Sequence, residues 1–166
     1  GLDAHQLVDP QARISQQQKL TIFRNVRRRT AVPEVGLRAG ARQRLSDFGV
    51  YGYALVSSRT FGDAVMLGIK HVRLAGPVLE KRFRIDGDSA VFVGHDVLDL
   101  GDVLPLATEF WFASIHKLAT CVLEGPMPSR RLLLPYARPP YAQAYERLFG
   151  CPVDFDAGVM EWHFDA

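Results

Sequence analysis

The 166-residue sequence has 20 basic and 18 acidic residues, a net charge of +2, and 48% hydrophobic against 23% charged residues. This size and composition are typical of one globular domain with its own core, and the apolar runs are too short to span a membrane. The balanced charge argues against nucleic-acid binding by this segment. The start, GLDAHQLVDP, lacks the basic flank and apolar stretch of a signal peptide.

One local exception to this balance is RNVRRR at residues 24–29, which clusters four arginines. We interpret it as a solvated helix face, with contact to an acidic partner or neighbouring domain as the alternative.

The first half of the chain has the three-and-four spacing of apolar residues that indicates helices. We expect helical segments at Leu2–Thr30, Glu34–Arg44, Ser46–Ser58 and Thr60–Leu74. Ser15 can cap the first segment, Pro33 should end it, and Thr60 with Asp63 resembles a capping box. For Ser46–Ser58 a strand remains the alternative, because its valines and tyrosines also suit a pleated surface.

The middle of the chain predicts a hairpin, a loop and a long helix. Lys81–Asp96 alternates apolar and polar residues about an Asp86-Gly87-Asp88 turn. After a loop at Leu98–Val103, the segment Leu104–Leu123 keeps helical spacing for over four turns, which favours a central helix packed on the sheet.

The closing stretch, Arg131 to Phe164, reads as strand, proline-rich turn, short helix, strand, turn and strand. Gly150 lies where a left-handed helix cap is expected. Because these strands are half or fully apolar, they need cover from the rest of the chain. The predicted fold class is therefore α+β: a helical N-terminal half packed on a mixed or antiparallel sheet of about five strands, with additional helices.

The sequence contains none of the motifs GxSxG, HExxH, GxGxxG or GxxxxGK. We therefore predict no catalytic residues, no metal site and no cofactor. Asp96, Asp99 and Asp102 read as a solvated loop, and Cys121 and Cys151 as buried free thiols in a reducing cytoplasm.

Two stretches resemble a known family. GVYGYALVSSRTFGDAVMLGIKHVRL and the closing YERLFGCPVDFDAGVMEWHFDA are similar to segments of the N-terminal, arabinose-binding-like domain of AraC/XylS-type transcription regulators, including ornithine-utilisation regulators. The resemblance covers about Val35 to Phe164, and its most specific part is Phe149-Gly150-Cys151-Pro152-Val153 with Phe155. The domain label does not imply an arabinose ligand.

The resemblance implies that residues 1–166 form a single effector-sensing and dimerisation domain of a cytoplasmic, homodimeric regulator. In such regulators paired helix-turn-helix units read DNA, and nothing after Phe164 could supply them here. We thus expect no DNA contact except through that missing domain, and no enzymatic activity.

The leading hypothesis is that a small metabolite binds between the helical half and the sheet and shifts the balance of two domain arrangements. From residue type alone, the candidate ligand-binding residues are Tyr51, Tyr53, His71, Arg73, Trp111, His116 and Tyr136. An arginine near aromatic rings suits a carboxylate effector such as an amino acid or fatty acid.

Several of these residues can also be explained by a purely structural role. His116 can be a core or boundary histidine, and His71 and Arg73 can be solvated cations at a helix end. Two other functions stay open: a dimerisation module without an effector, and a small enzyme of unrecognised type.

Overall fold

The computed structural model describes residues 14–165, so the expected helical start at residues 2–13 lies outside the described part. Helices and 3₁₀ turns come first along the chain: α2 (Gln16–Arg29), α3 (Val35–Gly40), η1 (Leu45–Phe48), α4 (Gly49–Val56), α5 (Phe61–His71) and η2 (Val72–Ala75). The sheet and its helices follow: β1 (Glu80–Asp86), β2 (Ser89–His95), η3 (Gly101–Val103), α6 (Leu104–Leu123), β3 (Ser129–Leu133), α7 (Gln143–Phe149), β4 (Val153–Asp154) and β5 (Met160–Asp165). The predicted α+β class is confirmed.

The described strands form one five-stranded sheet in the order β1-β2-β5-β3-β4. Its pairs are antiparallel except β3 with β4, which are parallel and are connected through α7. The register aligns Phe83, Phe92, Trp162 and Leu132 in one row across four strands. Trp162 is completely buried in this row, which forms the centre of the core.

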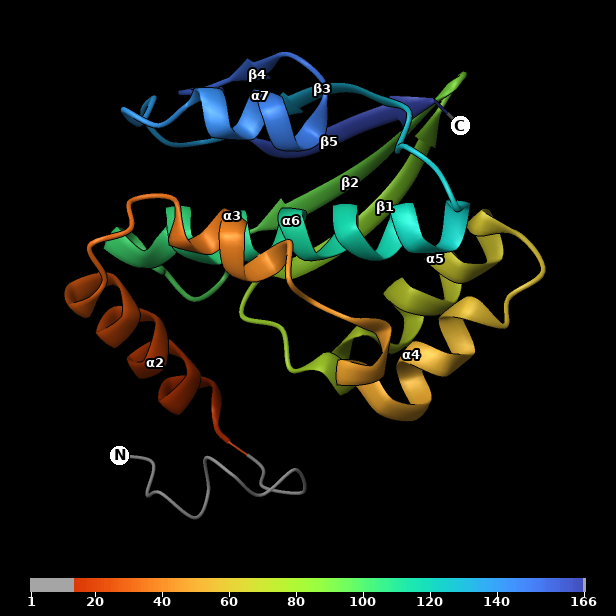
Figure 1. Ribbon diagram of the computed structural model, residues 1–166, viewed down its shortest axis with the longest axis horizontal. Coiled ribbons are helices and arrows are strands. Elements are labelled where there is room, and N and C mark those ends of the chain that lie inside the picture. The colour runs from red at the N-terminus through yellow and green to blue at the C-terminus, as the bar shows by residue number, and fades with distance from the viewer. Residues whose placement is uncertain (1–13, 166) are drawn as a thin grey trace.

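Helix α6 lies across the sheet, as the sequence predicts (Figure 1). The Phe112 and Trp162 rings meet edge to face at 6.1 Å. Gly94 on β2 leaves room for Trp111 of the same helix, because a Cβ atom there would lie 2.6 Å from the Trp111 ring and 2.4 Å from the Met160 sulfur.

Helix α3 packs directly on α6 through two glycines one helical turn apart. A Cβ atom at Gly36 would lie 2.5 Å from the Glu109 carboxylate, and one at Gly40 would lie 2.5 Å from the Phe110 carbonyl oxygen. The absence of side chains therefore lets the two backbones approach, which explains two glycines in a short helix.

The predicted helix ends are largely confirmed. Ser15 forms a capping box with Gln18, the Thr60 hydroxyl accepts the Asp63 N–H at 3.0 Å, and Gly150 ends α7 with φ +66°. Helix α2 ends at Arg29, ahead of Pro33.

The segment Ser46–Ser58 is helical as η1 and α4, so its strand alternative is wrong. One side-chain prediction is also wrong: Cys121 is exposed, whereas Cys151 is buried as expected. Cys121 lies in the last turn of α6, two residues from the buried Ala119 and therefore on another side of the helix.

Candidate functional site

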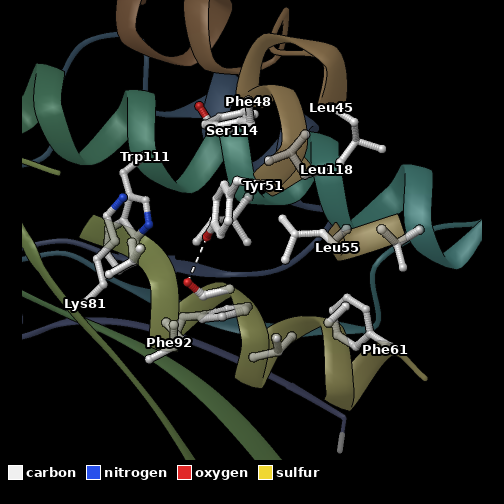
Figure 2. A pocket seen from close by; sticks show the side chains of 18 residues that line it. Leu45, Phe48, Tyr51, Leu55, Phe61, Lys81, Phe92, Trp111, Ser114 and Leu118 are labelled. Atoms are coloured by element: carbon white, nitrogen blue, oxygen red, sulfur yellow. Dashed lines mark hydrogen bonds between the residues drawn. The ribbon is translucent and has the colours of Figure 1, made fainter. Parts of the chain in front are cut away.

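An apolar cavity of about 140 Å³ lies between the α4–α5 pair, α6 and the first two strands. Figure 2 shows its lining side chains. We call this space the apolar cavity, and it is lined by Leu45, Phe48, Tyr51, Leu55, Phe61, Ala64, Val65, Gly68, Ile69, Val72, Lys81, Phe92, Trp111, Ser114, Ile115, Leu118, Ala119 and Val122.

The hydroxyl groups on the cavity wall are already occupied. Tyr51 donates to the Gly68 carbonyl oxygen at 2.8 Å, the dashed line in Figure 2. Ser114 donates to the Phe110 carbonyl oxygen of its own helix at 2.5 Å. With these groups satisfied, most of the wall behaves as an apolar surface.

Lys81 is the charged residue of this lining. Its ammonium group lies 5.2 Å from the centre of the Trp111 ring, within the range of a cation–π contact. Burial, with a smaller contribution from Lys19, lowers the pKa of Lys81 to about 7. Among the ion pairs formed within residues 14–165, none includes Lys81.

Trp111 carries the second uncommitted donor. Its indole Nε1 is buried and makes no hydrogen bond to any part of the chain that the structure describes. An unpaired buried N–H is costly, and native structures seldom retain one without a reason. Lys81 and Trp111 therefore offer two donors to a group that accepts hydrogen bonds.

Of the predicted ligand residues, the structure brings together Tyr51 and Trp111 on the apolar cavity. Tyr53 is 73% exposed and points away, because residues two apart on a helix face different sides. His71 is exposed at the end of α5. Arg73 lies in a separate groove between η2 and the start of β1.

The other two predicted residues occupy different surroundings. His116 packs against Phe149 and Trp162, with ring centres 5.5 Å and 5.8 Å away, and burial lowers its pKa. Tyr136 lies in a second cavity together with Glu109. The position of His116 is that of a histidine at the edge of the core, and Tyr136 lies outside the apolar cavity.

Sequence reasoning missed Lys81, although a signal was present. Lys81 and Phe83 are two residues apart on a strand, so their side chains share one face of the sheet. Lys81 and Phe83 are both partly buried, whereas the neighbouring Arg82 and Arg84, which point to the opposite face, are exposed. A lysine in phase with the apolar residues of a strand therefore indicates a buried or cavity-facing charge.

Within residues 14–165, no helix is long and apolar enough to cross a membrane. Over the same residues, no cluster of three or more His, Cys, Asp or Glu side chains is arranged to hold a metal ion.

Comparison with known proteins gives the family. Residues 1–166 match the arabinose-binding domain of AraC transcription regulators, an N-terminal domain. The chain belongs to this family.

This AraC-type domain is also similar to two individual regulators, one by sequence and one by structure. It is 28% identical over 132 residues to an ornithine utilization regulator of Pseudomonas aeruginosa, covering 80% of this chain and 38% of the relative. The crystal structure of the transcriptional regulator CdpR from Pseudomonas aeruginosa has the same fold, with a TM-score of 0.67 and 22% identity. That match covers 92% of this chain and 56% of CdpR. The chain thus spans about two fifths to somewhat over half the length of these regulators.

Proposed function

We propose that this chain is the effector-sensing domain of an AraC-type transcription regulator, and that its effector is a small carboxylic acid with an apolar body. The effector would occupy the apolar cavity. The observation that carries this proposal is the pair of donors, Lys81 and the unbonded Trp111 indole, within an otherwise apolar lining.

The volume of the cavity limits the apolar body. A dry protein cavity of about 150 Å³ lined by similar side chains can bind benzene, and the apolar cavity measures about 140 Å³. A phenyl ring or a chain of about six carbons therefore fits. At about 0.8 kcal/mol per buried CH₂, such a body would contribute roughly 4 to 5 kcal/mol before the head group is counted.

The two donors define the head group. A carboxylate accepts several hydrogen bonds and can take one from the Trp111 indole and one from the Lys81 ammonium. Its negative charge would also offset the cost of the buried ammonium, so binding should raise the pKa of Lys81. A carboxylic acid whose body carries ammonium groups, such as ornithine, would place positive charge against the apolar walls of the cavity.

Binding could reach the rest of a regulator through α4 and α5, which form one side of the cavity and lie at the edge of the molecule (Figure 1). A ligand that contacts α6 and this pair together favours the arrangement in which both are close. We propose that this preference sets how a DNA-binding domain is presented.

Thermal shift and calorimetry test this proposal. Hexanoate and phenylacetate should raise the melting temperature saturably, hexanol should do so only at much higher concentrations, and ornithine should not. Lys81→Met and Trp111→Phe should each weaken hexanoate binding at least tenfold, and the exposed control Lys117→Met should not. A response to hexanol equal to that of hexanoate, or full binding by Lys81→Met, would contradict the proposed head-group contacts.

A second candidate function is dimerisation without an effector. The observation that favours it is an apolar strip on α4, where Val50, Tyr53 and Val56 are 86%, 73% and 43% exposed. Spaced three residues apart, they share one helix face that a second copy of the chain could cover in a two-fold pair. Sedimentation should then give a ligand-independent dimer that Tyr53→Glu converts to a monomer.

A further inference from the structure

A second cavity, of about 400 Å³, lies between the linker after α2, the start of α6 and the loop that leads into α7. We call it the Glu109 cavity. It is lined by Arg27, Thr30, Ala31, Val32, Pro33, Val35, Asp102, Pro105, Leu106, Glu109, Tyr136, Ala137, Pro139 and Tyr141. It shares no lining residue with the apolar cavity, so a ligand here would be independent of the proposed effector.

Glu109 supplies the charge of this cavity. Its side chain is 2% exposed, and its Oε1 accepts hydrogen bonds from Tyr141 at 2.7 Å and Tyr145 at 2.5 Å. No lysine or arginine within residues 14–165 forms an ion pair with it. Burial raises the pKa of Glu109, opposed by hydrogen bonds from the two phenols and from the Gly36 backbone. A buried carboxylate without a cation is costly, and a cationic ligand would remove that cost.

Aromatic rings surround the same carboxylate. Tyr136 and Tyr141 line the cavity, and Tyr145 connects them, because its hydroxyl lies 3.2 Å from that of Tyr136 and its ring stacks on that of Tyr141 at 6.1 Å. The faces of such rings attract cations. A carboxylate that is surrounded by tyrosine hydroxyls and rings therefore suits an organic ammonium group.

The mouth of the Glu109 cavity is electrically balanced. Arg27 and Asp102 both line it and form an ion pair with each other, each about half exposed or more. The uncompensated charge is thus at the inner end, where a cation would be drawn. One carboxylate with phenols does not offer the several hard oxygen ligands that a calcium or magnesium ion requires.

We propose that the Glu109 cavity binds an aliphatic primary amine in its ammonium form. The ammonium group lies beside Glu109 against the tyrosine rings, and the alkyl chain runs toward the Arg27–Asp102 pair. Two matched probes separate charge from shape: butane-1,4-diamine and its neutral analogue butane-1,4-diol.

The first test is calorimetric titration of the unaltered protein with both probes. The diamine should bind saturably, and the diol at least tenfold more weakly, because the diol keeps the shape and hydrogen bonding but has no charge. Equal binding of the two, or no binding of the diamine, would overturn the proposal. This comparison needs no variant and therefore does not depend on the folding of one.

The second test uses Glu109→Gln, which keeps the size of the side chain and acceptors for the two phenols but removes the charge. Diamine affinity should fall at least tenfold, while the exposed control Glu146→Gln on α7 should leave it unchanged. Hexanoate binding in the apolar cavity should be the same in all three proteins. A Glu109→Gln protein that binds the diamine like the unaltered chain would show that Glu109 only ties helices together.

Discussion

Lys81 should reduce the stability of the ligand-free protein, and its replacement provides a direct measurement. Burial lowers the pKa of Lys81 from its ordinary value of 10.5 to about 7. At about 1.4 kcal/mol per tenfold change in proton affinity, this difference sets an upper limit of roughly 5 kcal/mol on the cost of the buried ammonium. Because the side chain is partly exposed, we expect Lys81→Met to stabilise the protein at pH 6 by roughly 2 to 3 kcal/mol.

The sign of the pH dependence follows from the direction of the shift. Between about pH 7 and 10.5 the unfolded chain retains the Lys81 proton that the folded chain has lost. The unfolded state then binds more protons, so the stability of the unaltered protein should rise with pH across this range, by at most about 1.4 kcal/mol per pH unit.

Urea unfolding at pH 6, 7.5 and 9 measures both effects. The advantage of Lys81→Met over the unaltered protein should shrink as pH rises, whereas the exposed control Lys117→Met should stay within about 0.5 kcal/mol at each pH. If Lys81→Met were less stable than the unaltered protein at pH 6, the reasoning that burial without an ion-pair partner destabilises the Lys81 ammonium would be refuted.

Three further predictions concern the scaffold. Gly40→Ala should cost about 1 to 3 kcal/mol, a fall of roughly 3 to 10 °C in melting temperature, because its methyl group meets the Phe110 backbone. Gly62→Ala should be neutral or stabilising by up to about 1 kcal/mol, because its methyl group would make only an ordinary contact with the Thr60 hydroxyl at 3.8 Å. Thr60→Ala should cost about 1 kcal/mol in urea unfolding through loss of the α5 cap. In native protein a thiol reagent should label Cys121 quickly and Cys151 only after unfolding, since burial raises the pKa of the Cys151 thiol to about 11.

Much of the fold could be predicted because the local signals agree with the tertiary structure. The apolar spacing of residues 104–123 and the turn at Gly87 each correspond to an observed element. The strand expected after the short helix is also present as β4 (Val153–Asp154), but its parallel pairing with β3 is a different case. Such pairing depends on residues far apart in the sequence, and no local pattern specifies it.

The candidate site could be predicted only in part. Tyr51 and Trp111 were found because aromatic residues line pockets, but residue type alone does not say which side of an element a side chain faces. Tyr53 and Tyr51 point to different sides of α4, and His116 and Trp111 point to different sides of α6, so only one of each pair lines the cavity. Glu109 gave no signal in the sequence, because a glutamate in a helix is ordinarily exposed. Its burial depends on Gly36, which leaves room beside it.

The positions of the two tryptophans in this chain have an optical consequence. Trp162 is sealed at the middle of the sheet, so its fluorescence should respond to global unfolding. Trp111 lines the apolar cavity with a positive charge 5.2 Å from its ring centre, so its emission should respond to a ligand that alters the local electric field. With Trp162 replaced by phenylalanine, emission from the remaining indole would follow occupancy of the cavity without an added dye.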